Sequence, residues 1–152
     1  MSSQTNPKTV ELYGHGIQRE AEADGSITPG MLVEREGSDK VKAHGTEGGN
    51  AAPSFALPFG MTGRGLEDEY DDEDQVVFST YAPGSGIYAL LDGGEDVNAA
   101  AFLTSAGDGA LKAAAAGNVI VAQALDDVDN SGETDPVRIR VEVVPGQTVP
   151  SE

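Results

Sequence analysis

The sequence Val137-Arg138-Ile139-Arg140-Val141-Glu142-Val143 carries the clearest structural signal in the chain. Its β-branched residues alternate with charged ones, and a period of two is the side-chain period of a β-strand. The pattern predicts a half-buried strand. Its four apolar side chains should point inward, while Arg138, Arg140 and Glu142 should point outward.

Short strand signals separated by turn residues run through the rest of the chain, whose 20 Gly and 8 Pro leave little room for long helices. Thr28-Pro29-Gly30 is typical of a type II turn, because Pro presets φ and Gly accepts a positive φ. Asp108-Gly109 between apolar runs predicts a hairpin over 102–112. The apolar runs Ile87–Leu91 and Val119–Leu125 predict strands buried on both faces. The sequence therefore predicts an all-β fold: a small single-domain β-barrel or sandwich of short strands.

The charge balance is extreme for a chain of this length. Asp and Glu number 26 against nine Lys and Arg, which gives a net charge of -17. Such a charge repels itself in dilute buffer, whereas at about 1 M salt the Debye length falls to ~3 Å and the repulsion is screened. The few Lys and the dispersed acids favour a protein adapted to multimolar salt. The alternative is an ordinary acidic protein from a mesophile.

Composition excludes several classes of protein and limits the core. There is no Cys for a disulfide, a thiolate metal site or a nucleophile. The chain has no apolar run long enough to span a membrane and no basic cluster for nucleic acid, so we expect neither partner. Leu, Ile, Val and Phe together make 32 of 152 residues, so the core should be thin or completed by a partner.

Few stretches suggest a chemical site. Asp127–Asp135 matches the opening of a calcium loop, but the twelfth position is Arg138 where a bidentate Glu is needed, so a polar hairpin turn is the favoured interpretation. The acidic run Glu67–Asp74 could hold cations and is more typical of a solvated loop. His15 and His44 lack the spacing of a metal site and suit turn or interface positions. The chain carries no catalytic motif, and we expect no enzyme activity, metal or cofactor.

We expect three segments: an N-terminal arm and link over 1–25, a β-rich domain over 26–145, and a tail over 146–152. The arm offers apolar side chains, and the polar segment Gln18–Gly25 could loop back to the domain. Pairing with a sheet edge on a partner would satisfy the arm's backbone. The alternative is that it forms the first strand of the domain's own sheet. The candidate interface residues are Val10, Leu12, Tyr13, Ile17, Arg138 and Arg140. The alternative for the two arginines is pairing with acids of the same chain.

Ile27–Glu34 (ITPGMLVE) is the first of several blocks that, taken in order, resemble the capsid decoration (head-stabilising) proteins of tailed viruses. This block is similar to an I-x-P-G-x-L-V-E opening in that family. The resemblance covers roughly residues 20–145. The further blocks are Val41–Gly45, Gly49–Leu57, Gly65–Tyr70, Asp74–Val76, Ser105–Leu111, Ala122–Leu125 and Arg138–Val144.

The resemblance implies a small β-rich protein, of the β-tulip or β-clip kind, on the outer capsid surface of a virion. It implies that the major capsid protein is the partner, that the protein forms a homotrimer, and that it reinforces the head without catalysis. Combined with the acidity, it points to a tailed virus of halophilic archaea. The first alternative is a spike or host-adhesion module. The second and less favoured alternative is a small trimeric β-fold enzyme, which would need a cleft with convergent polar groups.

Overall fold

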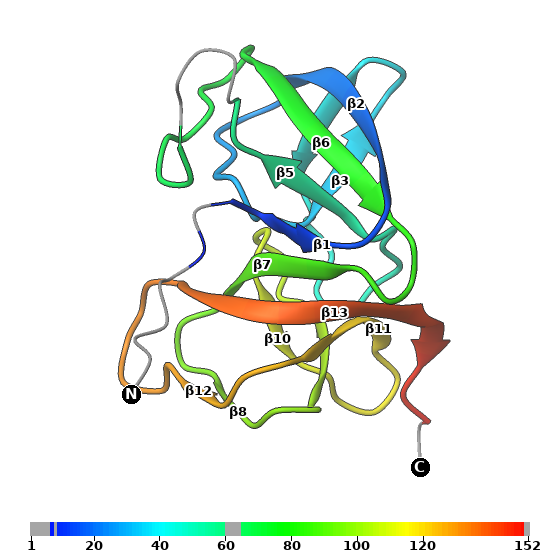
Figure 1. The fold of residues 1–152 in the computed structure, drawn as a ribbon, viewed down its shortest axis with the longest axis vertical. Helices are drawn as coiled ribbons and strands as arrows, with labels where there is room; N and C mark the ends of the chain where they lie inside the picture. The colour runs from blue at the N-terminus through cyan, green and yellow to red at the C-terminus, as the bar shows by residue number, and fades with distance from the viewer. Residues whose placement is uncertain (1–6, 8, 60–64, 151–152) are drawn as a thin grey trace.

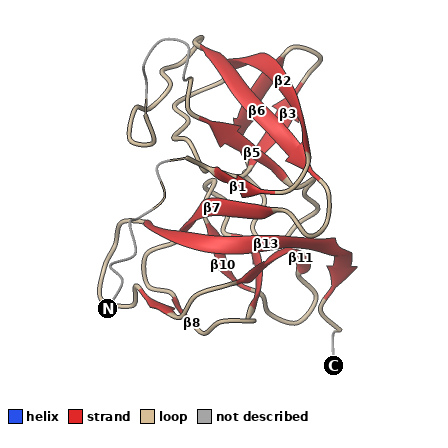
Figure 2. Cartoon of the chain, in the orientation of Figure 1, coloured by secondary structure: helices blue, strands red, loops and turns tan. Residues whose placement is uncertain are grey.

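The computed structural model describes residues 7, 9–59 and 65–150, and in these residues the fold is all-β. Figure 2 shows strands and loops and no helix. The predicted fold class is therefore confirmed. The strands in chain order are β1 Glu11–Tyr13, β2 Gly16–Ala23, β3 Val33–Glu36, β4 Lys40–Ala43, β5 Ser54–Leu57, β6 Gln75–Tyr81, β7 Gly86–Leu91, β8 Asp96–Val97, β9 Phe102–Ser105, β10 Leu111–Ala113, β11 Val119–Ala124, β12 Val128–Asp129 and β13 Val137–Thr148.

Two sheets lie one above the other along the long axis of the molecule (Figure 1). The N-terminal sheet has the order β3-β4-β2-β6-β5, and a bridge between Leu32 and Phe55 brings its two edges together at one point. The C-terminal sheet has the order β1-β7-β10-β9-β11-β13, and a further β7–β13 pairing closes it on itself. β8 and β12 form a separate two-stranded ribbon. Closure protects most strand edges from water.

The buried apolar side chains form two clusters, and β5 and β6 lie between them with both faces buried. Phe55 and Val77 belong to the larger cluster, which fills the C-terminal sheet and the junction between the sheets. Ala56 and Phe78, their neighbours on the same strands, belong to the smaller cluster inside the N-terminal sheet. Alternate residues of a strand point to opposite faces, so each of these strands serves both clusters. A chain poor in large apolar residues thus shares two strands between two thin cores.

Several predicted elements are confirmed. β13 contains the alternating sequence, with Ile139, Val141 and Val143 buried. β9 and β10 pair as the predicted hairpin. The amide of Met31 donates to the carbonyl of Thr28, and Gly30 has φ of 96°, as a type II turn requires.

The expected N-terminal link is wrong. Residues 16–23 form β2, which pairs with β6 over seven residue pairs and with β4. Its inward residues include Ala21 and Ala23, which are too small to give an apolar signal beside their polar neighbours in the sequence. The expected tail is also shorter, because β13 continues to Thr148. Residues 1–6, 8 and 151–152 of these segments lie outside the described residues.

Candidate interaction surface

The described residues contain no group of three His, Asp or Glu side chains placed to hold a metal ion. The Asp127–Asp135 loop is folded around Asn130, whose buried amide donates to the carbonyls of Asp92 at 3.0 Å and Asp135 at 2.9 Å. Asp129 accepts from the backbone and hydroxyl of Ser131. The Asn130 amide and the Asp129 carboxylate are thus held by the loop itself and by the residue that follows β7, and Asp127 accepts from the amide of Ala99. Within the described residues no helix is long and apolar enough to cross a membrane.

His44 is a buried connector between the two sheets. One ring nitrogen, Nε2, lies 2.7 Å from the carbonyl oxygen of Asn50, and that oxygen can only accept, so Nε2 carries the proton. Nδ1 then accepts from the hydroxyl of Ser105 in β9, at 2.7 Å. Because its ring is hydrogen-bonded on both sides and 1% exposed, His44 is structural. His15, between β1 and β2, donates its backbone amide to Ser85.

The outer side of the C-terminal sheet is the surface that best fits a contact with another protein. Directly paired residues in a sheet point to the same face. Arg140 pairs with Tyr88, Gln123 pairs with both Glu142 and Phe102, and Tyr13 pairs with Gly86. Leu125 donates its amide to the carbonyl of Arg140 and follows Gln123 by two residues. We call this set the outer face; its residues are Tyr13, Tyr88, Phe102, Gln123, Leu125, Arg140 and Glu142.

Large apolar side chains are exposed on the outer face. Tyr13 is 49% exposed, Phe102 42% and Leu125 38%, and they are three of the five exposed large hydrophobic side chains in the described chain. The whole sequence has only eight Tyr and Phe and no Trp. No described Asp or Glu is buried, so the rest of the surface is strongly charged. In such surroundings these exposed apolar side chains are the described part of the C-terminal sheet best suited to contact with another protein.

The charges of the outer face are already paired within the chain. Arg140 donates two hydrogen bonds to Asp126, at 2.9 and 2.7 Å, and this contact lowers the pKa of the Asp126 carboxyl below its ordinary value. The hydroxyl of Tyr13 donates to Glu142 at 3.4 Å. Burial and then the Glu142 carboxylate raise the pKa of Tyr13. The face therefore presents one neutralised ion pair, one carboxylate that is hydrogen-bonded to Tyr13, and ring surface.

Arg138 does not point outward into solvent as expected. Its guanidinium donates to the carbonyl of Pro29 at 2.6 Å and to that of Leu66 at 2.9 Å, and its side chain is 12% exposed. Burial lowers the pKa of the Arg138 guanidinium. Gly30 is required beneath it, since a Cβ there would collide with the guanidinium. Arg138 thus fastens β13 to two loops of the N-terminal part of the chain.

The remaining interface candidates are divided between the core and the two sheets. Val10 is fully buried in the larger core, and its carbonyl accepts from Tyr88. Leu12 is half-buried in β1, and Ile17, 59% exposed, lies on β2 opposite Thr80. These contacts favour the alternative in which the first strand belongs to the domain's own sheet. Of the six candidates, Tyr13 and Arg140 lie together on the outer face.

Sequence reasoning missed Tyr88, Phe102 and Leu125 as members of the outer face. Each sits in a run predicted as a buried strand or hairpin, where an apolar residue is expected to face the core. Val137 shows the opposite error, because the alternation placed it inward and it is 38% exposed at the start of β13. The pairing partners across β9, β11 and β13 would have revealed the face, and they depend on contacts distant in the sequence.

Comparisons with known proteins show a similarity in fold to a solved structure and no match by sequence. No family model matches the chain, and no curated protein sequence matches it. A solved structure, the head fiber gp8.5 N base of bacteriophage phi29, superposes with a TM-score of 0.56 at 13% sequence identity. The match covers 85% of this chain and 94% of that chain. The two proteins therefore share a fold over nearly the whole of the phage structure.

Proposed function

We propose that this chain is a structural protein of a virion that binds the outer surface of the assembled capsid as a homotrimer and stabilises the head. The observation that carries the proposal is the likeness of fold to the head fiber base of phage phi29, which extends over 94% of that structure. Its binding partner on the particle is the major capsid protein. The role requires binding and mechanical reinforcement and no catalytic step.

The outer face supports a protein partner. Burying Tyr13, Phe102 and Leu125 against a protein surface removes apolar area from water at about 25 cal/mol per Å². Oligomerisation adds buried surface that a thin-cored monomer lacks, and closed cyclic symmetry is the common arrangement of homo-oligomers. We assign the outer face to the capsid or subunit contact.

The charge supports a saline environment, and we propose a tailed virus of halophilic archaea as the source. A net charge of -17 destabilises a compact chain through self-repulsion, and salt relieves it. Exposed carboxylates also keep a particle surface hydrated where the salt concentration is multimolar.

The second candidate is the base of a spike or fibre, because the solved neighbour is itself a head fiber base. The two roles differ in the number of copies on each particle. Quantitative mass spectrometry of purified virions separates them: hundreds of copies per particle support a decoration protein, and about a dozen support a spike.

Co-sedimentation with capsids that lack this protein tests the proposal. The wild-type chain should bind saturably, and light scattering at high salt should give the mass of a trimer. Phe102→Ser combined with Leu125→Ser should weaken capsid binding or trimerisation by about tenfold or more. Ile17→Ser, a similar change away from the outer face, is the control and should leave both unchanged. A wild-type chain that fails to bind would contradict the proposal, and a double variant equal to the wild type would contradict the assignment of the outer face.

A further inference from the structure

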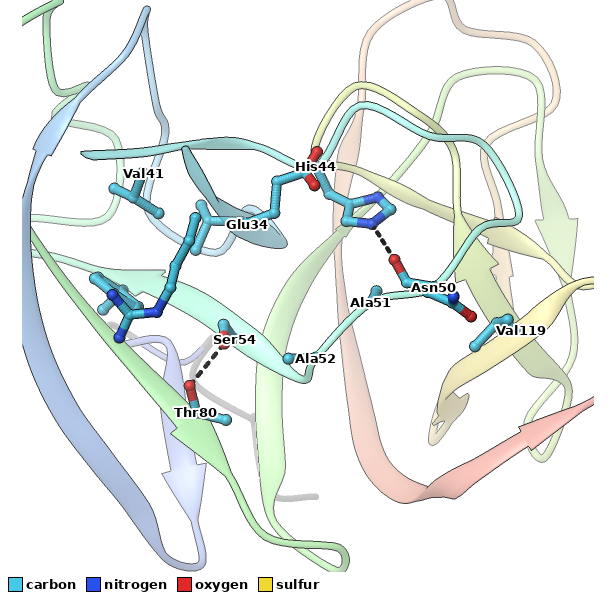
Figure 3. Close-up of a pocket in the computed structure, with 12 residues that line it drawn as sticks. Glu34, Val41, His44, Asn50, Ala51, Ala52, Ser54, Thr80 and Val119 are labelled. Carbon is cyan, nitrogen blue, oxygen red and sulfur yellow. Dashed lines mark hydrogen bonds between the residues drawn. The ribbon is translucent and has the colours of Figure 1, made fainter. Parts of the chain in front are cut away.

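A groove of about 460 Å³ opens where β3 and the chain leading into β5 separate. The Leu32–Phe55 bridge joins the two segments, and beyond it β3 forms one wall while residues 50–54 form the other. Figure 3 shows Glu34 and His44 above the groove and Ser54 and Thr80 below, the last two joined by a hydrogen bond of 2.7 Å. None of its lining residues belongs to the outer face.

The groove exposes an unpaired strand edge. β3 is an edge strand of the N-terminal sheet and pairs along its length with β4 only. His44 donates its amide to the carbonyl of Leu32, and hydrogen-bonded pairs alternate along an antiparallel ladder. Glu34 and Glu36 therefore direct their backbone groups toward β4, and Arg35 directs its N–H and C=O toward the free edge. Such an edge accepts an additional strand.

Two arginines without carboxylate partners flank the groove. The guanidinium of Arg35 lies 5.8 Å from the centre of the Phe78 ring. Arg19 pairs in register with Phe78, so its side chain lies on the same face of the sheet. In the described part of the chain neither arginine forms an ion pair, whereas Arg138 and Arg140 do. In a chain with 26 acids, the exposed guanidinium of Arg35 over Phe78, with Arg19 on the same face of the sheet, leaves a local site for negative charge.

We propose that this groove binds an extended acidic segment of a partner protein, which adds as a strand to the free edge of β3. A carboxylate on the added strand would face Arg35, and the next carboxylate on the same side would reach Arg19. The methylene groups of these acidic side chains would rest on Phe78. The proposal concerns a separate surface and does not depend on the proposed function.

The register also defines which acidic sequences fit. Arg35 shares one face of β3 and β4 with the core residue Val41, whereas Glu34 and Glu36 lie on the opposite face of β3, and Glu34 also lines the groove. Acids on that opposite face would meet like charges, which destabilises a cross-strand pair. The preferred segment therefore alternates acidic and neutral residues. A nucleic acid carries a negative charge at every nucleotide, so it does not offer this alternation of charged and neutral residues.

Binding of labelled peptides tests the proposal. The probe is a fluorescein-labelled, end-capped peptide of four Glu-Val repeats, and its comparison has Gln in place of each Glu, both titrated at one fixed salt concentration. We expect the Glu peptide to bind about tenfold more tightly, because it can form two exposed ion pairs that the Gln peptide cannot form. Hydrogen exchange of the Arg35 amide should slow when the Glu peptide is bound.

Variants locate the site. Arg19→Gln with Arg35→Gln should remove the preference for the Glu peptide. Lys40→Gln removes one positive charge from the other face of β4, outside the groove, and should retain the preference. Equal binding of the two peptides, no binding of either, or unchanged exchange at Arg35 would overturn the proposal. Tighter binding of an oligothymidylate than of the Glu peptide would also overturn it. Thermal unfolding of each variant checks that the fold is intact.

Discussion

Replacing Arg138 with methionine tests whether the guanidinium fastens the two parts of the molecule together. The substitution keeps the length of the side chain and removes both hydrogen bonds to the carbonyls of Pro29 and Leu66. Hydrogen bonds from a charged donor contribute about 1.5–3 kcal/mol each to stability. Part of this loss is offset, because the methionine variant no longer buries a charged group. We expect a loss of about 3 kcal/mol in the free energy of unfolding. For a chain of this size the melting temperature should fall by about 6–12 °C.

Arg140→Met is the matched control, because it removes the same charge from the same face of β13. The Arg140 side chain is 40% exposed and its partner Asp126 27%, so this ion pair should contribute at most about 1 kcal/mol. Circular dichroism melts of both variants at one high salt concentration give the comparison. If Arg138→Met melts at the same temperature as Arg140→Met, or above it, the fastening role of Arg138 is wrong.

Four further changes probe the core, the charges and the solvent. His44→Ala should lower the free energy of unfolding by about 2–4 kcal/mol in a denaturant titration, because Ser105 and Asn50 lose their buried partner; an effect below ~1 kcal/mol would contradict the connecting role. Val10→Ala should cost about 2 kcal/mol if β1 belongs to the domain's own core, and almost nothing if it is a free arm. Burial and the nearby Asp108 carboxylate raise the pKa of Asp92. The folded state therefore binds the Asp92 proton more tightly than the unfolded chain does. The free energy of unfolding falls as the pH rises from the ordinary pKa of an Asp carboxyl through the raised pKa of Asp92. Asp92→Asn should therefore stabilise the protein near pH 7 and have no effect near pH 2, which paired melts can measure. The unfolding midpoint of the wild type should rise steeply between about 0.1 M and about 3 M KCl, and a flat profile would show that the acids are not an adaptation to salt.

Local patterns predicted the parts of the fold that depend on neighbouring residues. The alternation at 137–143 was sufficient to predict a strand, and the residues Pro29-Gly30 and Asp108-Gly109 were sufficient to predict turns. A strand period or a turn conformation is set within a few residues. β2 could not be found this way. Its buried positions hold Ala21 and Ala23, whose methyl groups carry almost no apolar signal between Gln18, Glu20 and Glu22.

The candidate site depended on contacts that are distant in the sequence. Arg138 and Arg140 occupy equivalent positions in the alternating pattern, yet the loops at Pro29 and Leu66 cover the first and leave the second exposed. Phe102 becomes part of the outer face only because β9 pairs with β11. The pairing order of the strands decides such placements, and it is a property of the whole chain.

A density map of the intact virion tests the central proposal most directly. We predict three copies of this chain around each occupied threefold or quasi-threefold position on the outer capsid surface, with Phe102 and Leu125 covered by protein. Copies inside the shell, single copies without contact to one another, or no density for this fold on the particle would contradict it.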